Sequence, residues 1–217
     1  MKRNRLWLLG LLVPLALASL VAVRAHAQDA SVLKPPKGAR VALVVFEDLQ
    51  CPDCARANPL LEQAARTYNI PIVRYDFPLP MHPWAQQAAV LARYFDTLSA
   101  APKSRRVSAN AHSASTLGDE FRDAIFRHQR EITPQNLHAF AEKFAAEHKV
   151  ALPFVIDPQG KLAAEVEADR ELGKRVGISH TPTIYVVSNA RAGTPFVEVV
   201  DRRQLFQLIE AVQKEAQ

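Results

Sequence analysis

A strand, a helix and a second strand near the start of the chain constrain its fold most. Residues 41–46 form a short, uninterrupted apolar run rich in β-branched side chains, which predicts a buried strand. From Cys51 to Tyr68 apolar side chains recur at helical spacing, and residues 70–77 predict another strand. A parallel pair of strands joined by one helix implies a right-handed crossover. We therefore expect an α/β protein.

The remainder of the chain divides into a helical block and a second group of strands. Apolar stripes predict helices over three segments, 84–98, 121–130 and 137–148. Further on, the sequence predicts two strands and a final helix, over 183–187, 196–200 and 202–215. The predicted order is β-α-β, a helical block and β-β-α, within one domain over residues 40–217.

A long polar segment, residues 99–118, separates the first two helices of this block. Because a structureless segment of this length is unusual inside a compact domain, we expect a mobile surface loop. Its basic residues Lys103, Arg105 and Arg106 are interpreted as a solvated face rather than as a partner contact.

The formal net charge of +5 raises the question of nucleic-acid binding, and the position of the charge answers it. Residues 1–27 hold four of the 27 Lys and Arg residues and no Asp or Glu. The rest of the chain, with 23 basic and 22 acidic residues, is nearly neutral at about +1. No nucleic-acid partner is expected.

The first 27 residues have the three regions of a secretory signal peptide. A basic start precedes an apolar run over residues 6–23, and an Ala-His-Ala sequence that ends at Ala27 fits cleavage after that residue. The alternative is an uncleaved membrane anchor, because the run is at the short end of what spans a bilayer. In either case we expect the folded part to be exported, to the periplasm or another extracytoplasmic space. Residues 28–39 are polar and are interpreted as a leader.

The chain has two cysteines, Cys51 and Cys54, at the predicted junction of strand and helix. A disulfide between residues one helical turn apart closes a very short loop and stabilises a fold little. At a helix N-terminus the unpaired N–H groups favour the thiolate of Cys51, and Cys54 can attack a mixed disulfide formed there. The spacing therefore predicts a dithiol for exchange. A zinc site is the alternative and would need further ligands, such as His82 and His180.

Two motifs resemble those of a known family. The segment Phe46-Glu-Asp-Leu-Gln-Cys51-Pro-Asp-Cys54 resembles the F-x-D-x-x-C-P-x-C start of the DsbA-like thiol–disulfide oxidoreductases of the thioredoxin superfamily. Thr181-Pro182-Thr183, directly before a predicted strand, resembles their cis-proline loop. The resemblance implies a thioredoxin fold with a helical insertion, about residues 82–176, between the β-α-β and β-β-α halves. We expect no cofactor and no bound metal.

The resemblance also implies roles for individual residues. The first cysteine of such proteins is the nucleophile and the second resolves the mixed disulfide, roles that fall here on Cys51 and Cys54. The loop proline packs against the disulfide, and the backbone of the residue before it pairs with the substrate strand, which implies these roles for Pro182 and Thr181. Neighbouring residues are expected to tune the dithiol: Pro52, Asp53, Asp48 and His180.

Asp53 departs from the family pattern. Strongly oxidising relatives have His in the dipeptide between the cysteines, whereas the carboxylate of Asp53 adds a negative charge near Cys51. By electrostatics alone we expect Cys51 to be less acidic, and the disulfide less oxidising, than in those relatives. Glu47, a further acid ahead of the cysteines, is interpreted as a solvated loop residue, and the alternative is a general base for the resolving cysteine.

The expected function is that of an exported enzyme, a protein thiol–disulfide oxidoreductase that acts on the thiols or disulfides of exported proteins. The direction stays open between oxidase and reductase or isomerase. An oxidase would need a membrane redox partner for recycling, as the resemblance implies. Two alternatives remain: a thioredoxin-fold metal-binding carrier, and a chaperone that needs neither cysteine.

Overall fold

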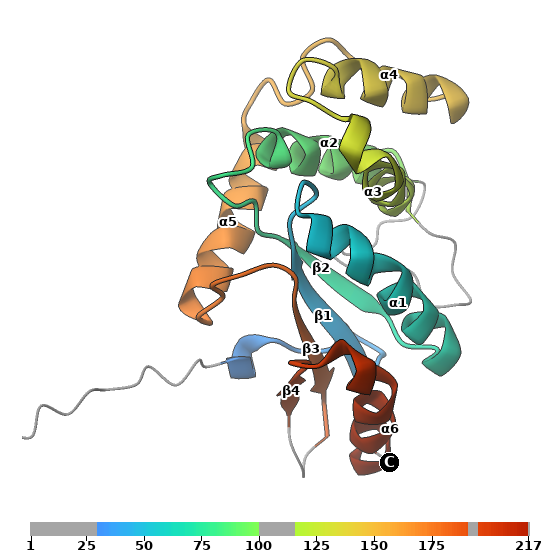
Figure 1. Ribbon diagram of the computed structural model, residues 1–217, viewed down its shortest axis with the longest axis vertical. Helices are drawn as coiled ribbons and strands as arrows, with labels where there is room; N and C mark the ends of the chain where they lie inside the picture. The colour runs from blue at the N-terminus through green and yellow to red at the C-terminus, as the bar shows by residue number, and fades with distance from the viewer. Residues whose placement is uncertain (1–29, 100–115, 191–194, 217) are drawn as a thin grey trace, which may run out of the picture.

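Figure 1 shows the computed structural model of the chain, in which residues 30–99, 116–190 and 195–216 are described. The predicted signal peptide with its cleavage site, and the three basic residues of the predicted 99–118 loop, lie outside the described residues. Within the described ranges, no helix is long and apolar enough to cross a membrane.

The centre of the fold is a mixed four-stranded sheet with the strand order β2-β1-β3-β4. Strand β1 (Val41–Glu47) pairs in parallel with β2 (Ile72–Asp76) and antiparallel with β3 (Thr183–Ser188). Strand β4 (Phe196–Glu198) pairs antiparallel with β3 at the edge of the sheet. The predicted strands are present within a few residues of their expected bounds, and the first two have the predicted parallel pairing.

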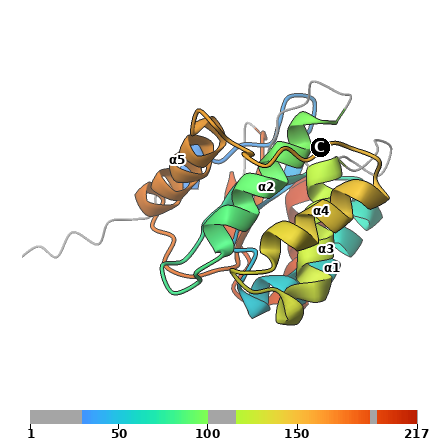
Figure 2. The ribbon, with the colours of Figure 1, turned by 90° about the horizontal axis from the view of Figure 1, so that it is seen from above.

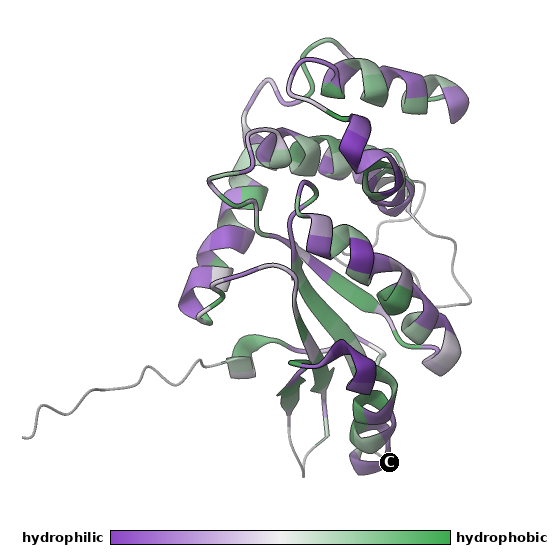
Figure 3. Ribbon diagram, in the orientation of Figure 1, coloured by the Kyte–Doolittle hydropathy of each residue, from purple (hydrophilic) through white to green (hydrophobic). Residues whose placement is uncertain are grey.

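The side chains of β1 alternate between two covered faces of the sheet. Leu43 and its alternate neighbours pack in one apolar cluster with side chains of α1 (Pro52–Tyr68) and α6 (Leu205–Glu215). Val44 and its alternate neighbours belong to a second cluster on the opposite face. Figure 3 shows β1 and β3 as hydrophobic, which is expected of strands that are buried on both faces.

The bounds of α1 follow from its sequence. Cys51 is the N-cap in an extended conformation, and Pro52 takes the first helical position, where a missing N–H costs no hydrogen bond. Asn69 ends the helix in the left-handed conformation, with φ 51° and ψ 48°, which Asn tolerates better than most residues. Pro59 lies inside α1 and has no N–H, so it cannot donate to the carbonyl oxygen of Ala55.

The insertion between β2 and β3 is helical, as expected (Figures 1 and 2). Its described part contains α2 (Ala85–Thr97), α3 (Leu117–His128), α4 (Leu137–Glu147) and α5 (Lys161–Arg175). Short 3-10 turns lie at Ala30–Val32 (η1), Gln129–Glu131 (η2) and Arg202–Gln204 (η3). Helices α2, α3 and α4 share an apolar cluster that also includes both cysteines. The dithiol therefore lies where the insertion meets the sheet.

Helix α3 begins earlier than predicted. Thr116 caps it, because its side chain accepts a hydrogen bond from the N–H of Asp119 and the Asp119 carboxylate accepts one from the N–H of Thr116. This reciprocal capping adds a full turn ahead of residue 121. The polar segment predicted to reach residue 118 therefore ends before it.

Helix α5 is absent from the sequence prediction. Its buried stripe is narrow, with Leu162 and Val166 as its large apolar members, and most of its remaining side chains are polar or charged. Asp169 takes a buried position by binding Arg93. Gly173 permits close packing, since a Cβ there would lie 2.5 Å from the Phe77 ring. A stripe interrupted by an acid and a glycine gives little helical periodicity.

The segment predicted as a leader contributes to the core. Ala30 and Leu33 are each 1% exposed and belong to the same apolar cluster as Val44 of β1. The described part of residues 28–39 is therefore packed on the domain at this point rather than detached from it.

A buried network of charged side chains joins the insertion to the sheet. The Asp76 carboxylate at the end of β2 accepts hydrogen bonds from Arg93 of α2, at 2.7 Å, and from Arg122 of α3, at 2.6 Å. Arg93 also binds Asp169 of α5. Because every one of these buried charges has a partner of opposite sign, none carries the full desolvation cost of an isolated ion. The network fixes three helices of the insertion against β2.

Candidate active site

The two cysteines lie where β1 ends and α1 begins. Cys51 is the N-cap of α1, and Cys54 lies within its first turn. Cys51 is 7% exposed and Cys54 is 2% exposed, and both thiols are free. The more exposed cysteine is thus the one predicted to act as the nucleophile.

The loop before β3 lies against Cys51. The Cys51 thiol donates a hydrogen bond of 3.4 Å to the carbonyl oxygen of Thr181, a residue 130 positions away. The Thr181–Pro182 peptide bond is cis, as the family resemblance implies. While Cys51 is a thiol, the buried Thr181 hydroxyl has no hydrogen-bond partner within the described part of the chain. Folding thus brings the two predicted motifs together.

The surroundings of Cys51 favour its thiolate. A hydrogen bond from the Cys54 thiol has the largest effect on the pKa of Cys51 and lowers it. Burial raises this pKa, whereas hydrogen bonds from the Thr181 side chain and from the N–H groups of Cys54 and Asp53 lower it further. Together these interactions lower the pKa of Cys51 from 9.0 to about 5. At neutral pH Cys51 is therefore a thiolate, which is the nucleophilic form of cysteine.

Cys54 has the opposite character. Burial, followed by the hydrogen bond that its thiol gives to Cys51, raises the pKa of Cys54 well above 9.0. The backbone N–H of Asp48 donates to the Cys54 sulfur at 3.4 Å and offsets part of this rise. The pair therefore consists of one thiolate and one thiol, with pKa values pushed apart by their surroundings.

The Asp48 carboxylate organises the loops around the dithiol. Its side chain is fully buried, and it accepts hydrogen bonds of 2.7 Å from the backbone N–H groups of Gln50 and Leu79. The ring Nδ1 of His82 lies 2.7 Å from the same carboxylate. One side chain thus ties the loop before α1 to the loop after β2. Asp48 acts on the dithiol through its backbone, and its carboxylate holds that backbone in place.

Asp53 forms ion pairs with two arginines. Its carboxylate accepts hydrogen bonds from Arg56, at 3.1 Å, and from Arg202 of η3, at 2.7 Å. Burial opposes ionisation of Asp53, but the hydrogen bonds and charges of these arginines outweigh it and lower the pKa of Asp53. The negative charge that the sequence places beside Cys51 is therefore compensated by Arg202, a residue that sequence analysis missed.

Glu47 is not a solvated loop residue, contrary to the sequence interpretation. It ends β1 at 3% exposure and accepts a hydrogen bond of 2.7 Å from Arg74, with Arg122 at 3.4 Å. Burial raises the pKa of Glu47, and the two arginines offset part of this rise. The arginine partners lie on β2 and α3, so nothing near Glu47 in the sequence indicates its burial. Its charge in turn raises the pKa of Cys54.

The two histidines considered as zinc ligands have different surroundings. His82 lies against Asp48, as described above, whereas His180 is exposed and its backbone carbonyl accepts a hydrogen bond of 2.8 Å from the Thr183 hydroxyl. Within residues 30–99, 116–190 and 195–216, no group of three or more His, Cys, Asp or Glu side chains could hold a metal ion.

Gln129 is a second residue of the site that sequence analysis missed. Its side-chain Nε2 donates hydrogen bonds to the carbonyl oxygens of Leu49, at 2.8 Å, and Cys51, at 3.1 Å. These bonds connect η2 of the insertion to the backbone on which the nucleophilic sulfur sits. The sequence places Gln129 at the end of a predicted helix, where nothing marks it as part of the site.

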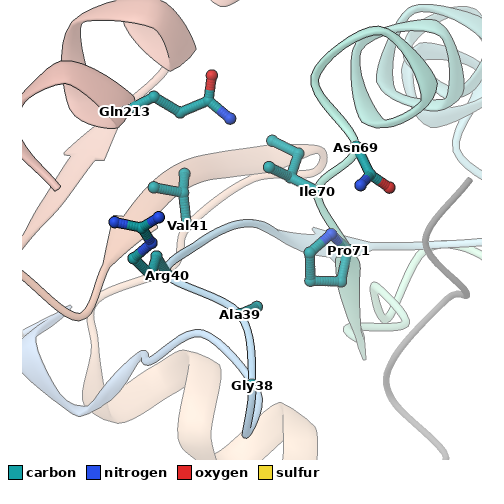
Figure 4. Close-up of a pocket in the computed structure, with 8 residues that line it drawn as sticks. All are labelled: Gly38, Ala39, Arg40, Val41, Asn69, Ile70, Pro71 and Gln213. Atoms are coloured by element: carbon teal, nitrogen blue, oxygen red, sulfur yellow. The ribbon is translucent and has the colours of Figure 1, made fainter. Parts of the chain in front are cut away.

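A separate pocket lies at the opposite end of β1 (Figure 4). It has a volume of about 470 Å³ and is lined by the segments 38–41 and 69–71 and by Gln213. The guanidinium of Arg40 donates a hydrogen bond of 3.3 Å to the carbonyl oxygen of Ala216. No cysteine or histidine lines this pocket. The candidate active site is therefore not this pocket but the region of the two cysteines, at the carboxyl end of β1.

Two curated proteins match this chain over part of their length. The chain is 25% identical over 179 residues to Na(+)/H(+) antiporter NhaA 1 of Salinispora arenicola. It is 26% identical over 176 residues to Na(+)/H(+) antiporter NhaA 3 of Salinispora tropica. Each match covers 79% of this chain and 24% of the relative, so the chain spans about a quarter of the length of these proteins.

Solved DsbA structures resemble this chain over most of its length. Alpha-DsbA1 from Wolbachia pipientis has a TM-score of 0.61 at 15% identity, covering 84% of this chain and 90% of that one. Alpha-DsbA2 from the same organism has a TM-score of 0.59 at 15% identity, with coverages of 82% and 85%. Pseudomonas aeruginosa DsbA2 has a TM-score of 0.55 at 19% identity, with coverages of 83% and 93%. These identities are low, so the likeness establishes the fold.

A family described as Thioredoxin matches residues 36–198, a range that contains both cysteines, the cis-proline loop and the whole helical insertion. The match agrees with the order of strands and with the structural likeness to DsbA proteins. The chain belongs to the thioredoxin family, and its fold is a thioredoxin fold with a DsbA-like helical insertion between the β-α-β and β-β-α halves.

Proposed function

We propose that the chain is an enzyme, a protein thiol–disulfide oxidoreductase that works through Cys51 and Cys54. One observation carries the proposal: Cys51 is an acidic thiol beside the cis-proline loop, whereas Cys54 is buried and protonated. Disulfide exchange needs this contrast, because one sulfur reacts with the partner and the other resolves the mixed disulfide. Alpha-DsbA2 of Wolbachia pipientis is described as a thiol-disulfide exchange protein, which supports the same chemistry here.

In the oxidising direction the cycle starts from the Cys51–Cys54 disulfide. A substrate thiolate attacks the Cys51 sulfur and forms a mixed disulfide, while Cys54 leaves and takes up a proton. A second substrate thiolate then attacks the substrate sulfur of the mixed disulfide, and Cys51 leaves as a thiolate. The substrate gains a disulfide and loses two electrons, which the chain holds as its dithiol. The backbone of Thr181 would pair with the substrate strand, and Pro182 would shape the groove that receives it.

The electrostatics of the site favour this direction. A thiolate that is stabilised on Cys51 stabilises the reduced protein relative to its disulfide, and a disulfide whose reduced form is stabilised is a stronger oxidant. The charge of Asp53, which by itself would weaken the oxidant, is compensated by Arg202 and Arg56. Reduction or isomerisation remains available where an electron donor keeps the dithiol reduced.

We further assign residues 1–27 to a signal peptide cleaved after Ala27, and residues 40–217 to the catalytic domain with its insertion at about 82–176. Substrates would then be exported proteins with thiols or disulfides, in the periplasm or another extracytoplasmic space. Oxidation of many substrates needs an acceptor for the electrons left on the dithiol. A quinone-linked membrane redox partner fits this requirement.

The test compares the wild-type chain with Cys51→Ser in two assays, the reduction of insulin by dithiothreitol and the refolding of a scrambled disulfide protein. The wild type is expected to accelerate at least one of them, and Cys51→Ser to lose the effect. Absence of exchange by the wild type in both assays would overturn the proposal.

Cys51→Ser and the double variant Cys51→Ser with Cys54→Ser separate the two rival functions. Suppression of aggregation that survives the loss of both cysteines would favour a chaperone. Stoichiometric zinc or copper that is retained on purification and lost in Cys51→Ser would favour a metal-binding carrier.

A further inference from the structure

A groove runs between α1 and α3, beginning beside the dithiol. Two adjoining hollows form it, with volumes of about 300 Å³ and 350 Å³, and both are lined by Ala55, Phe126 and Arg127. The first hollow starts at Pro52, directly after the nucleophilic cysteine, and the second extends along α1 to Arg66. Figures 1 and 2 show the two helices side by side. We refer to the two hollows together as the α1–α3 groove.

Most charged side chains of the α1–α3 groove already have partners. Arg56 pairs with Asp53, and Glu62 pairs with Arg74 at 2.6 Å and with Arg66 at 3.7 Å. The remaining two acids are also engaged: Asp123 accepts a hydrogen bond of 2.6 Å from Asn58, and Glu131 lies 3.3 Å from His128. Each acid of the groove thus has a hydrogen-bond or ion-pair partner within this chain, and the partner of Asp123 is a neutral amide.

Arg127 and Arg130 are different. Both line the first hollow of the groove, and both are exposed. Neither has a hydrogen-bond or ion-pair partner among residues 30–99, 116–190 and 195–216. Arg127 lies in the last turn of α3, and Arg130 lies three positions later in η2. Figure 3 shows this part of the chain as hydrophilic. Among the described residues, the groove therefore presents two guanidinium groups beside the dithiol that have no ion-pair partner.

The walls of the α1–α3 groove also suit a polypeptide. Phe126, Ala55 and Pro59 provide an apolar surface between the charged groups. An apolar surface and two arginines match an extended acidic segment better than a small ligand.

We propose that the α1–α3 groove receives an acidic segment of the protein substrate, whose carboxylates bind Arg127 and Arg130 while its cysteine reacts at Cys51. An extended chain advances about 3.3 Å per residue, so a segment bonded to Cys51 enters the groove within a few residues. This inference rests on the proposed oxidoreductase function, because it names the class of substrate on which the dithiol acts.

The test uses two cysteine peptides that differ in their flanking residues, Asp and Glu in one and Ser and Gln in the other. Each peptide is supplied as a mixed disulfide with 2-mercaptoethanol. The Cys51 thiolate attacks the peptide sulfur and releases the mercaptoethanol thiolate, after which Cys54 attacks Cys51, releases the peptide thiolate and closes the protein disulfide. For the wild type at low salt, the rate constant for the acidic peptide is expected to be about tenfold that for the neutral peptide.

Two double variants complete the kinetic test, one in the α1–α3 groove and one on α5, away from the groove. Arg127→Glu with Arg130→Glu is expected to remove the preference for the acidic peptide, measured as the ratio of its rate constant to that of the neutral peptide in the same variant. Lys161→Glu with Arg175→Glu makes the same charge change on α5, across the sheet from the groove, and is expected to keep the preference. An acidic preference of the same size in both double variants would overturn the proposal.

A binding measurement separates this inference from the function on which it rests. The probe is the acidic peptide with Ser in place of its cysteine, labelled with a fluorophore. Its Kd is expected to weaken about tenfold in Arg127→Glu with Arg130→Glu and to stay unchanged in the α5 variant. An unchanged Kd in the groove variant overturns the groove. Absence of exchange with the neutral peptide in the wild type overturns the oxidoreductase function instead.

Discussion

The guanidinium of Arg202 donates a hydrogen bond of 2.7 Å to the carboxylate of Asp53, although 149 positions separate the two residues. The pair lies at the start of α1, where the charge of every neighbour affects the thiolate of Cys51. The Pro-Asp dipeptide between the cysteines therefore does not act as an isolated negative charge, because the final β-α connection supplies a positive one.

Charge variants of this pair should shift the pKa of Cys51 in opposite directions. Arg202→Met leaves the Asp53 charge less compensated and should raise the pKa of Cys51 by about 0.2–0.7 pH unit, a size that fits a partly exposed ion pair. Asp53→Asn should lower it, and the double variant should return it close to the wild-type value. Titration of the thiolate by its ultraviolet absorption measures all four proteins. Equal values for Arg202→Met and the wild type would show that the pair does not act on Cys51.

The hydroxyl of Thr181 gives a second prediction. In the protonated state Cys51 donates to the Thr181 carbonyl, and once Cys51 ionises the buried hydroxyl of Thr181 can donate to the thiolate. Thr181→Val removes this donor at similar volume and should raise the pKa of Cys51, whereas Thr181→Ser should keep the wild-type value. The pH dependence of alkylation by iodoacetamide measures it. A Thr181→Val profile that matches the wild type would contradict this role.

The reduction potential of the Cys51–Cys54 disulfide should fall as the pH rises, with a steeper slope below the pKa of Cys51 than above it. Below pH 5 reduction takes up two protons and two electrons, and the potential should fall by about 59 mV per pH unit. Above the Cys51 pKa of about 5 only one proton is taken up, and the slope should drop to about 30 mV per pH unit.

The same pKa sets the sign of the effect on stability. Because the folded state lowers the pKa of Cys51 from 9.0 to about 5, its thiolate stabilises the reduced protein fully above pH 9 and loses this effect as the pH falls through 5. Equilibration with glutathione and denaturant unfolding of both redox forms measure the two quantities. A single slope of about 59 mV from pH 4 to 8 would contradict the low pKa.

The buried ion network predicts a large loss of stability. Arg122→Met leaves the buried Asp76 with one arginine fewer and should lower the free energy of unfolding by about 3–5 kcal/mol. Arg127→Met makes the same substitution on the exposed side of α3 and should alter the free energy of unfolding by less than about 0.5 kcal/mol. Urea denaturation compares them, and equal midpoints for the two variants would be incompatible with a stabilising network.

Sequence reasoning succeeded where the signal was local. The apolar run of β1, the helical spacing of α1 and the cysteine pair at their junction each depend on neighbouring residues, and the structure has all three. The cis bond before Pro182 followed from a resemblance in the loop rather than from any periodicity.

The residues that sequence reasoning missed depend on distant partners. Glu47 is buried because Arg74 and Arg122 approach it from β2 and α3, and an acid at the end of a strand gives no sign of them. Gln129 binds backbone carbonyls that no side-chain pattern encodes. Helix α5 was missed because a buried acid occupies part of its apolar stripe.

The most direct test of the central claim is capture of the mixed disulfide. Cys54→Ser removes the resolving thiol, so incubation with a peptide disulfide should yield a stable adduct of one peptide, mapped by mass spectrometry to Cys51. Cys51→Ser should yield no adduct at neutral pH, because the pKa of Cys54 is raised well above 9.0. Failure of Cys54→Ser to form the adduct, or equal adducts in both variants, would contradict the assignment of Cys51 as the exchanging nucleophile.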